Sequence, residues 1–199
     1  EKIKNKLNNT FSNKIEYRRL EFVGPTVSKD LVQKGILAIF FAVIAMLAYI
    51  WFRFELPFAM GAVIALIHDV VLTLGVFSIV GLEFNLATVA AILLIIGYSM
   101  NDTVVVYDRV RENLRKFKKM NFEELIDKSV NETLARTINT TATTILALLA
   151  LYFLGGQIIS DFSFAMLWGI IVGTYSSIFI ASTILTFLNV RSYSEKKEN

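Results

Sequence analysis

The chain has 199 residues, of which 55% are hydrophobic, and its formal net charge is +3. A soluble domain is about 45–50% apolar, so this composition indicates a membrane protein. The sequence contains no cysteine and only one histidine, which excludes a disulfide framework and a Cys-ligated metal and argues against a His-based zinc site. The small net charge argues against nucleic-acid binding. We also expect no cofactor.

Residues 1–34 predict the end of a folded external domain and a linker. The segment Arg19–Val23 alternates enough to form a strand, and Gly24-Pro25 ends it because proline has no N–H to donate. Residues 26–34 then lead into the membrane. Glu1 is not an initiator methionine, so we interpret the sequence as a fragment whose N-terminal part is missing.

Five apolar runs follow, each near the length needed to cross about 30 Å of hydrocarbon. They form a transmembrane domain, residues 35–190, ahead of a polar tail, residues 191–199. The expected spans are residues 35–52, 57–80, 84–107, 137–154 and 162–188. Between the third and fourth spans, the charged loop 109–136 carries apolar residues near helical spacing, which predicts an amphipathic helix at the membrane surface. These residues are Phe122, Leu125, Ile126 and Val130.

Lysine and arginine predict the orientation of these spans. The loop 109–136 and the tail are rich in both, whereas the turns 81–83 and 155–161 contain neither. By the positive-inside rule, the basic segments are cytoplasmic and the two turns without lysine or arginine are periplasmic. The N-terminal segment then lies outside.

Polar side chains inside the spans are the candidate functional residues, because a charge at the bilayer centre costs about 2.5–3.5 kcal/mol or more. His68 and Asp69 lie in the middle of the second span. Two helical stripes are polar, one in the third span and one in the fourth. The first contains Tyr98, Asn101, Asp102 and Val105, and the second contains Arg136, Asn139, Thr140 and Thr143.

Asp102 and Arg136 lie at similar depth in antiparallel spans, which predicts a titratable ion pair. Desolvation favours a neutral carboxyl group and a nearby guanidinium favours the ionised one, so a small movement of the arginine can change proton occupancy. Structural roles stay open. Arg136 can snorkel to the interface, Asp102 can be satisfied by water or Asn101, and His68 can bond a neighbouring carbonyl or hydroxyl group.

The fifth span carries small residues at strict i+4 spacing, which predicts close packing against another helix in this chain or in a partner. These residues are Gly169, Gly173, Ser177 and Ala181. No nucleophile–base arrangement occurs, and Gly155-Gly156 is a turn rather than a phosphate loop because no Gly-Lys-Ser/Thr follows. We therefore expect a protein that is not an enzyme.

Residues 97–113, GYSMNDTVVVYDRVREN, resemble the signature of the SecF family of protein-export membrane proteins, which normally reads close to GYSINDTVVVFDRIREN. The sister family SecD is expected to carry an Asp-Ala-Asn-type motif in place of Asn101-Asp102-Thr103. Four further segments resemble SecF motifs. They are residues 21–25, 65–70, 136–141 and 173–181.

The resemblance implies an all-α polytopic protein whose five spans form half of an RND-superfamily bundle, preceded by the last strand of a truncated periplasmic ferredoxin-like domain. It implies a bacterial inner-membrane subunit that uses the proton-motive force, with no other cofactor, to complete preprotein export. The implied partners are SecD, the SecYEG translocon, YajC, YidC, preproteins and the lipid bilayer.

The proton relay that the resemblance implies includes Asp102 and Arg136, and we add Asn101, Asp69 and His68 as candidates. Two alternatives stay open. One is half of an RND-like proton-coupled transporter of small molecules, and the other is a purely structural subunit that stabilises the translocon.

Overall fold

Helices joined by short turns make up the described structure. The computed structural model describes residues 25–82, 85–188 and 190, so the expected strand at residues 19–23 and the tail 191–199 lie outside the described residues. The elements are α2 (Pro25–Arg53), α3 (Leu56–Val80), α4 (Leu86–Lys116), α5 (Phe122–Leu154), α6 (Gly156–Tyr175), the π-helical segment η1 (Ser176–Ala181) and α7 (Ser182–Phe187). In this described part, five helices are long and apolar enough to cross a membrane, which confirms the predicted all-α membrane fold.

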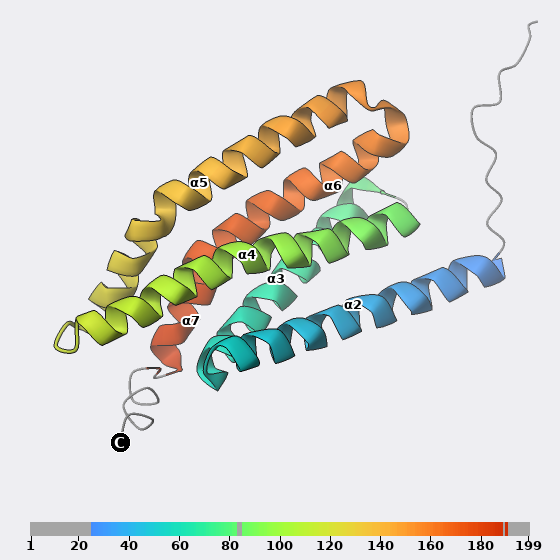
Figure 1. The fold of residues 1–199 in the computed structure, drawn as a ribbon. Coiled ribbons are helices and arrows are strands. Elements are labelled where there is room, and N and C mark those ends of the chain that lie inside the picture. Colours follow the sequence, from blue (N-terminus) through green and yellow to red (C-terminus); the bar gives the residue numbers. More distant parts are fainter. Residues whose placement is uncertain (1–24, 83–84, 189, 191–199) are drawn as a thin grey trace, which may run out of the picture.

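Helix α4 lies in the middle of the bundle and contacts every other helix of the described chain. Figure 1 shows α2 and α5 on opposite sides, with α3, α4 and α6 between them. The spans of α4 and α6 are the most buried, and those of α2 and α5 are the least buried. The core of the bundle is therefore built around α4 and α6.

The helix ends follow from local sequence. Gly81 ends α3 at φ 73°, and Gly156 opens α6 at φ 74°, a left-handed conformation that glycine adopts without steric penalty. Asn85 caps α4, because its side-chain oxygen accepts the Thr88 N–H at 3.1 Å while the Thr88 hydroxyl accepts the Asn85 N–H at 3.3 Å. This reciprocal cap satisfies two backbone donors that have no partner inside the helix.

Several helices extend further than the apolar runs suggest. Residues 26–34, expected to form a linker, belong to α2, and an ion pair of 2.8 Å joins Lys34 to Asp30 one turn away. Proline is favoured in the first turn of a helix, where its missing N–H is not needed. Accordingly, α2 begins at Pro25. Hydropathy gives the length of chain in the hydrocarbon, whereas the helix itself continues into the polar region.

The charged segment 109–136 differs from its expected form, because it is not a separate surface helix. Helix α4 continues to Lys116 and α5 begins at Phe122, so the segment is divided between two helix extensions. Its apolar residues Leu125 and Ile126 are buried in the core that includes Val110. The apolar face thus packs on α4 rather than on lipid.

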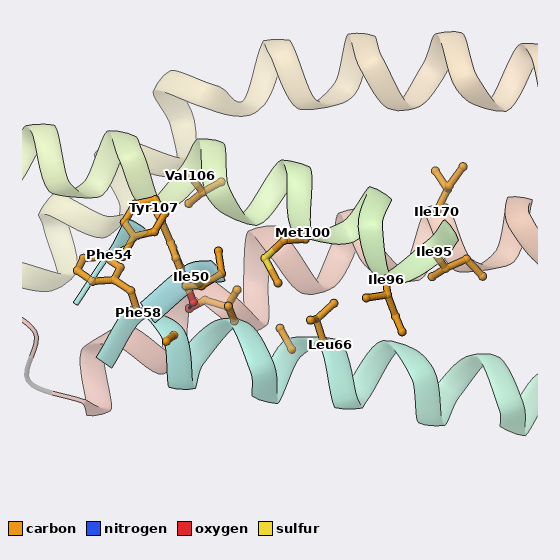
Figure 2. Close-up of a cluster of buried hydrophobic side chains, with 14 of the residues drawn as sticks. Ile50, Phe54, Phe58, Leu66, Ile95, Ile96, Met100, Val106, Tyr107 and Ile170 are labelled. Carbon is orange, nitrogen blue, oxygen red and sulfur yellow. Dashed lines mark hydrogen bonds between the residues drawn. The ribbon is translucent and has the colours of Figure 1, made fainter. Parts of the chain in front are cut away.

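An aromatic cluster joins α3 and α4 to the turn after α2. The rings of Phe58 and Tyr107 lie 5.2 Å apart, and those of Phe54 and Tyr107 lie 6.2 Å apart, both edge to face. Figure 2 shows these three rings together at one end of the core, with Ile95 and Ile170 toward the other. On the surface nearby, Arg53 pairs with Asp108 at 2.9 Å, so the α2–α3 turn is held to α4 by both packing and charge.

Candidate functional site

The four small residues of the last span pack against α4, inside this chain. A Cβ atom at Gly169 would lie 2.2 Å from Ile95 Cδ1, and one at Gly173 would lie 2.9 Å from Ser99 Cβ. Further along, the Ser177 hydroxyl lies 2.8 Å from that of Thr103, and the Ala181 carbonyl accepts the Tyr107 hydroxyl at 3.0 Å. The α4 residues in these four contacts are Ile95, Ser99, Thr103 and Tyr107, which also recur every four residues. Two parallel helices therefore meet along matched i+4 rows, and the missing glycine side chains allow a close approach.

Asp102 lies on α4 next to this row and is almost fully buried, with 3% of its surface exposed. Its Oδ2 atom is buried and accepts no hydrogen bond from any described group. A carboxylate oxygen in this position lacks the donors that buried acceptors normally have. Binding a proton would remove the uncompensated charge.

Arg136 is exposed on α5 and acts on Asp102 electrostatically. Among the described residues, no salt bridge joins the two, so the expected ion pair is not formed in this conformation. Asp102 is buried in the bundle, whereas Arg136 lies at its surface. Tyr98 of the α4 stripe does contact α5, where its hydroxyl donates to Thr144 Oγ1 at 3.2 Å.

The rest of the α5 stripe faces outward. Asn101 on α4 and Asn139, Thr140 and Thr143 on α5 are all exposed. The threonine hydroxyls donate to carbonyls of their own helix, as in the 3.0 Å bond from Thr143 to Asn139, which satisfies them inside a membrane. This chain by itself therefore leaves a polar face on α5, next to Arg136.

A second cluster of polar side chains lies around Asp69, which has no exposed surface. Its Oδ2 atom accepts hydrogen bonds from Ser99 Oγ at 2.6 Å and from Ser176 Oγ at 2.8 Å. Its Oδ1 atom lies 3.1 Å from His68 Nδ1. We call Asp69, His68, Ser99 and Ser176 the Asp69 cluster, and it joins α3, α4 and η1.

Ser99 and Ser176 were not among the residues singled out from the sequence. Ser99 lies within the polar run of the third span, and Ser176 directly precedes the small residue Ser177. A hydroxyl group in the middle of an apolar span is a weak signal, because it can bond its own helix. Within the described residues, no group of three His, Asp or Glu side chains could hold a metal ion.

The chain matches the family described as "Protein export membrane protein SecD/SecF, C-terminal" over residues 2–191. It is 54% identical over 196 residues to the protein translocase subunit SecF of Rickettsia rickettsii and 53% identical to that of Rickettsia felis, covering 98% of this chain in both cases. The chain spans 64% of the length of each of these two relatives.

Two solved structures share the fold. The crystal structure of SecDF from Thermus thermophilus, described as a translocon-associated membrane protein, gives a TM-score of 0.79 at 42% identity and covers 83% of this chain and 23% of that one. A second, of SecDF in a super-membrane-facing form, gives a TM-score of 0.74 at 39% identity and covers 89% of this chain and 24% of that one.

Proposed function

Because this chain belongs to the SecD/SecF family of protein-export membrane proteins, we propose that it is the membrane-spanning part of a SecF-type accessory subunit of the preprotein translocase. It is a multi-pass protein of the bacterial inner membrane. In this proposal it acts with SecD beside the SecYEG translocon, uses the proton-motive force to complete preprotein export, and is not an enzyme. YajC and YidC are further proposed partners.

The observation that best supports proton use is the buried Oδ2 atom of Asp102, which accepts no hydrogen bond from the described residues. An ionised carboxylate there is unfavourable unless Arg136 approaches it or a proton neutralises it. Arg136 lies within electrostatic range but not in contact. If a proton and the Arg136 guanidinium neutralise the Asp102 carboxylate in turn, proton binding is coupled to a movement between α4 and α5.

Each proton that crosses a potential of 100 mV releases about 2.3 kcal/mol. A cycle in which Asp102 takes a proton from the periplasmic side and releases it to the cytoplasmic side can use this free energy. Asn101 is proposed to assist from its exposed position one residue away. His68 and Asp69 belong to a separate group of polar side chains, the Asp69 cluster.

The test is preprotein export by the full-length protein carrying Asp102→Asn, with and without a proton gradient, normalised to the amount of assembled complex. We expect the variant to assemble but to lose the response to the gradient. Asp127→Asn is the matched control, because it makes the same change at an exposed position of α5 and should export normally.

Arg136→Lys should also impair export, because lysine keeps the charge but loses the planar fork that can hold a carboxylate with two bonds. An Asp102→Asn variant whose export still responds fully to the gradient would refute the relay. Loss of protein level in proportion to loss of export would instead support the purely structural alternative.

A further inference from the structure

The Asp69 cluster contains a buried carboxyl group with little charge compensation. Within the described chain, His68 is the one titratable side chain that acts on Asp69. Helix α4 contributes Ser99 and η1 contributes Ser176, both neutral. Helices α2, α6 and α7 also pack on α3, and α2 carries no charged residue between Lys34 and Arg53.

An ionised Asp69 beside a neutral His68 would place a bare charge inside the membrane, which costs about 2.5–3.5 kcal/mol or more. One further proton, added to this pair, removes that net charge. His68 is 30% exposed and Asp69 is fully buried, so His68 links the buried carboxyl to the outside of the bundle. The cluster thus joins a buried proton acceptor to a side chain that reaches the surface of the bundle.

The hydroxyl group of Ser176 can respond to that proton. It has one hydrogen and two acceptors within reach, Asp69 Oδ2 at 2.8 Å and Gly173 O at 3.1 Å. When Asp69 is ionised, Ser176 donates to Oδ2. When a proton binds Oδ2, the new O–H can donate to Ser176 Oγ, and the hydrogen of Ser176 can turn to Gly173 O, with no other bond broken.

Ser176 is also the first residue of η1, where the backbone leaves α-helical geometry. Its N–H is shared between the carbonyls of Gly173 and Val172, so the backbone here lies between two hydrogen-bonding patterns. Such π-helical turns occur frequently at functional sites. A change in the Ser176–Gly173 hydrogen bond therefore acts at the point where α6 gives way to η1.

We propose that the Asp69 cluster is a second proton-binding site, separate from Asp102, and that proton binding there shifts η1 relative to α3. The surroundings of the two carboxyl groups differ, because Asp102 is influenced electrostatically by Arg136 of α5, whereas Asp69 accepts a hydrogen bond from Ser176 of η1. The shift would reach α4 through the Thr103–Ser177 contact. This site does not depend on the proposed export function.

The test uses full-length protein in lipid nanodiscs, with spin labels on Val71→Cys of α3 and Phe179→Cys of η1 in a background without other cysteines. Both positions are exposed, at 60% and 58%. We expect the distance between the labels to change between alkaline and acidic pH. Asp69→Asn should hold the acidic distance at every pH, because its amide N–H replaces the O–H of the protonated acid.

Infrared difference spectra between the same two pH values report proton binding directly. We expect a carboxyl band that disappears in Asp69→Asn and persists in Ser176→Ala, while Ser176→Ala loses most of the distance change. Thr73→Val is the matched control, because Thr73 is a buried hydroxyl of α3 that donates at 2.7 Å to the Asp69 carbonyl and not to its carboxyl group. Thr73→Val and Asp102→Asn should both keep the distance change.

An undiminished pH-dependent distance change in Asp69→Asn would overturn the proposal, as would a carboxyl difference spectrum that this variant leaves intact. Loss of the distance change in Asp102→Asn would also overturn it, because the two sites would then not be separate.

Discussion

The contact between Gly169 and Ile95 gives the sharpest stability prediction. A Cβ atom at Gly169 would lie 2.2, 2.3 and 2.9 Å from the Cδ1, Cγ1 and Cγ2 atoms of Ile95. Ile95 is 1% exposed and branched at Cβ, so its side chain cannot easily rotate away. Overpacking of this kind costs about 1–3 kcal/mol, and we expect Gly169→Ala to lower the free energy of unfolding by that amount.

Gly97→Ala is the matched control. Gly97 also lies within a transmembrane helix, but a Cβ atom there would meet nothing within 4 Å. Since alanine favours a helix over glycine by roughly 0.5–1 kcal/mol, this variant should be as stable as the wild type or slightly more stable. The assay is reversible unfolding of the full-length protein in mixed micelles, with the folded fraction followed as denaturing detergent is added.

A double variant separates the steric effect from a general loss of helix packing. Ile95→Ala removes all three of the atoms that the new Cβ would approach, and by itself it should destabilise the bundle by about 2–5 kcal/mol. In Gly169→Ala/Ile95→Ala the clash is absent and part of the cavity is filled, so the combined loss should be smaller than the sum of the single losses. Strict additivity, or equal stability of Gly169→Ala and Gly97→Ala, would refute the reasoning.

Two further predictions concern the orientation of the chain in the membrane and the hydrogen bond from Tyr107 to η1. We predict that Lys118 is cytoplasmic and Gln157 is periplasmic, so with a cysteine at either position a membrane-impermeant thiol reagent should label intact cells at 157 and not at 118. The opposite pattern would reverse the orientation. Tyr107→Phe should lower the free energy of unfolding by about 0.5–1.5 kcal/mol, because it deletes the 3.0 Å bond to the Ala181 carbonyl, whereas Tyr49→Phe, on the exposed surface of α2, should have no effect in the same unfolding assay.

The sequence by itself determined those features that depend on neighbouring residues. Apolar runs of membrane-spanning length predicted the five spans, and Gly81 marked the end of α3 because a left-handed turn favours glycine. The strict i+4 spacing of small residues predicted a closely packed helix face. Hydropathy did not locate the helix ends, because helices such as α4 continue through the charged region to Lys116, where Lys116 pairs with Glu112 at 2.6 Å.

Only the tertiary structure decided which faces meet. The small-residue face packs on α4, and helical periodicity alone could not distinguish this from a face for a partner. The donors to Asp69 come from residues 30 and 107 positions away, Ser99 and Ser176. The sequence predicts a similar depth for Arg136 and Asp102, but in the structure Arg136 is exposed, Asp102 is buried, and no salt bridge joins them. Periodicity assigns a side chain to a face of its own helix, whereas the rotation and spacing of packed helices determine its partner.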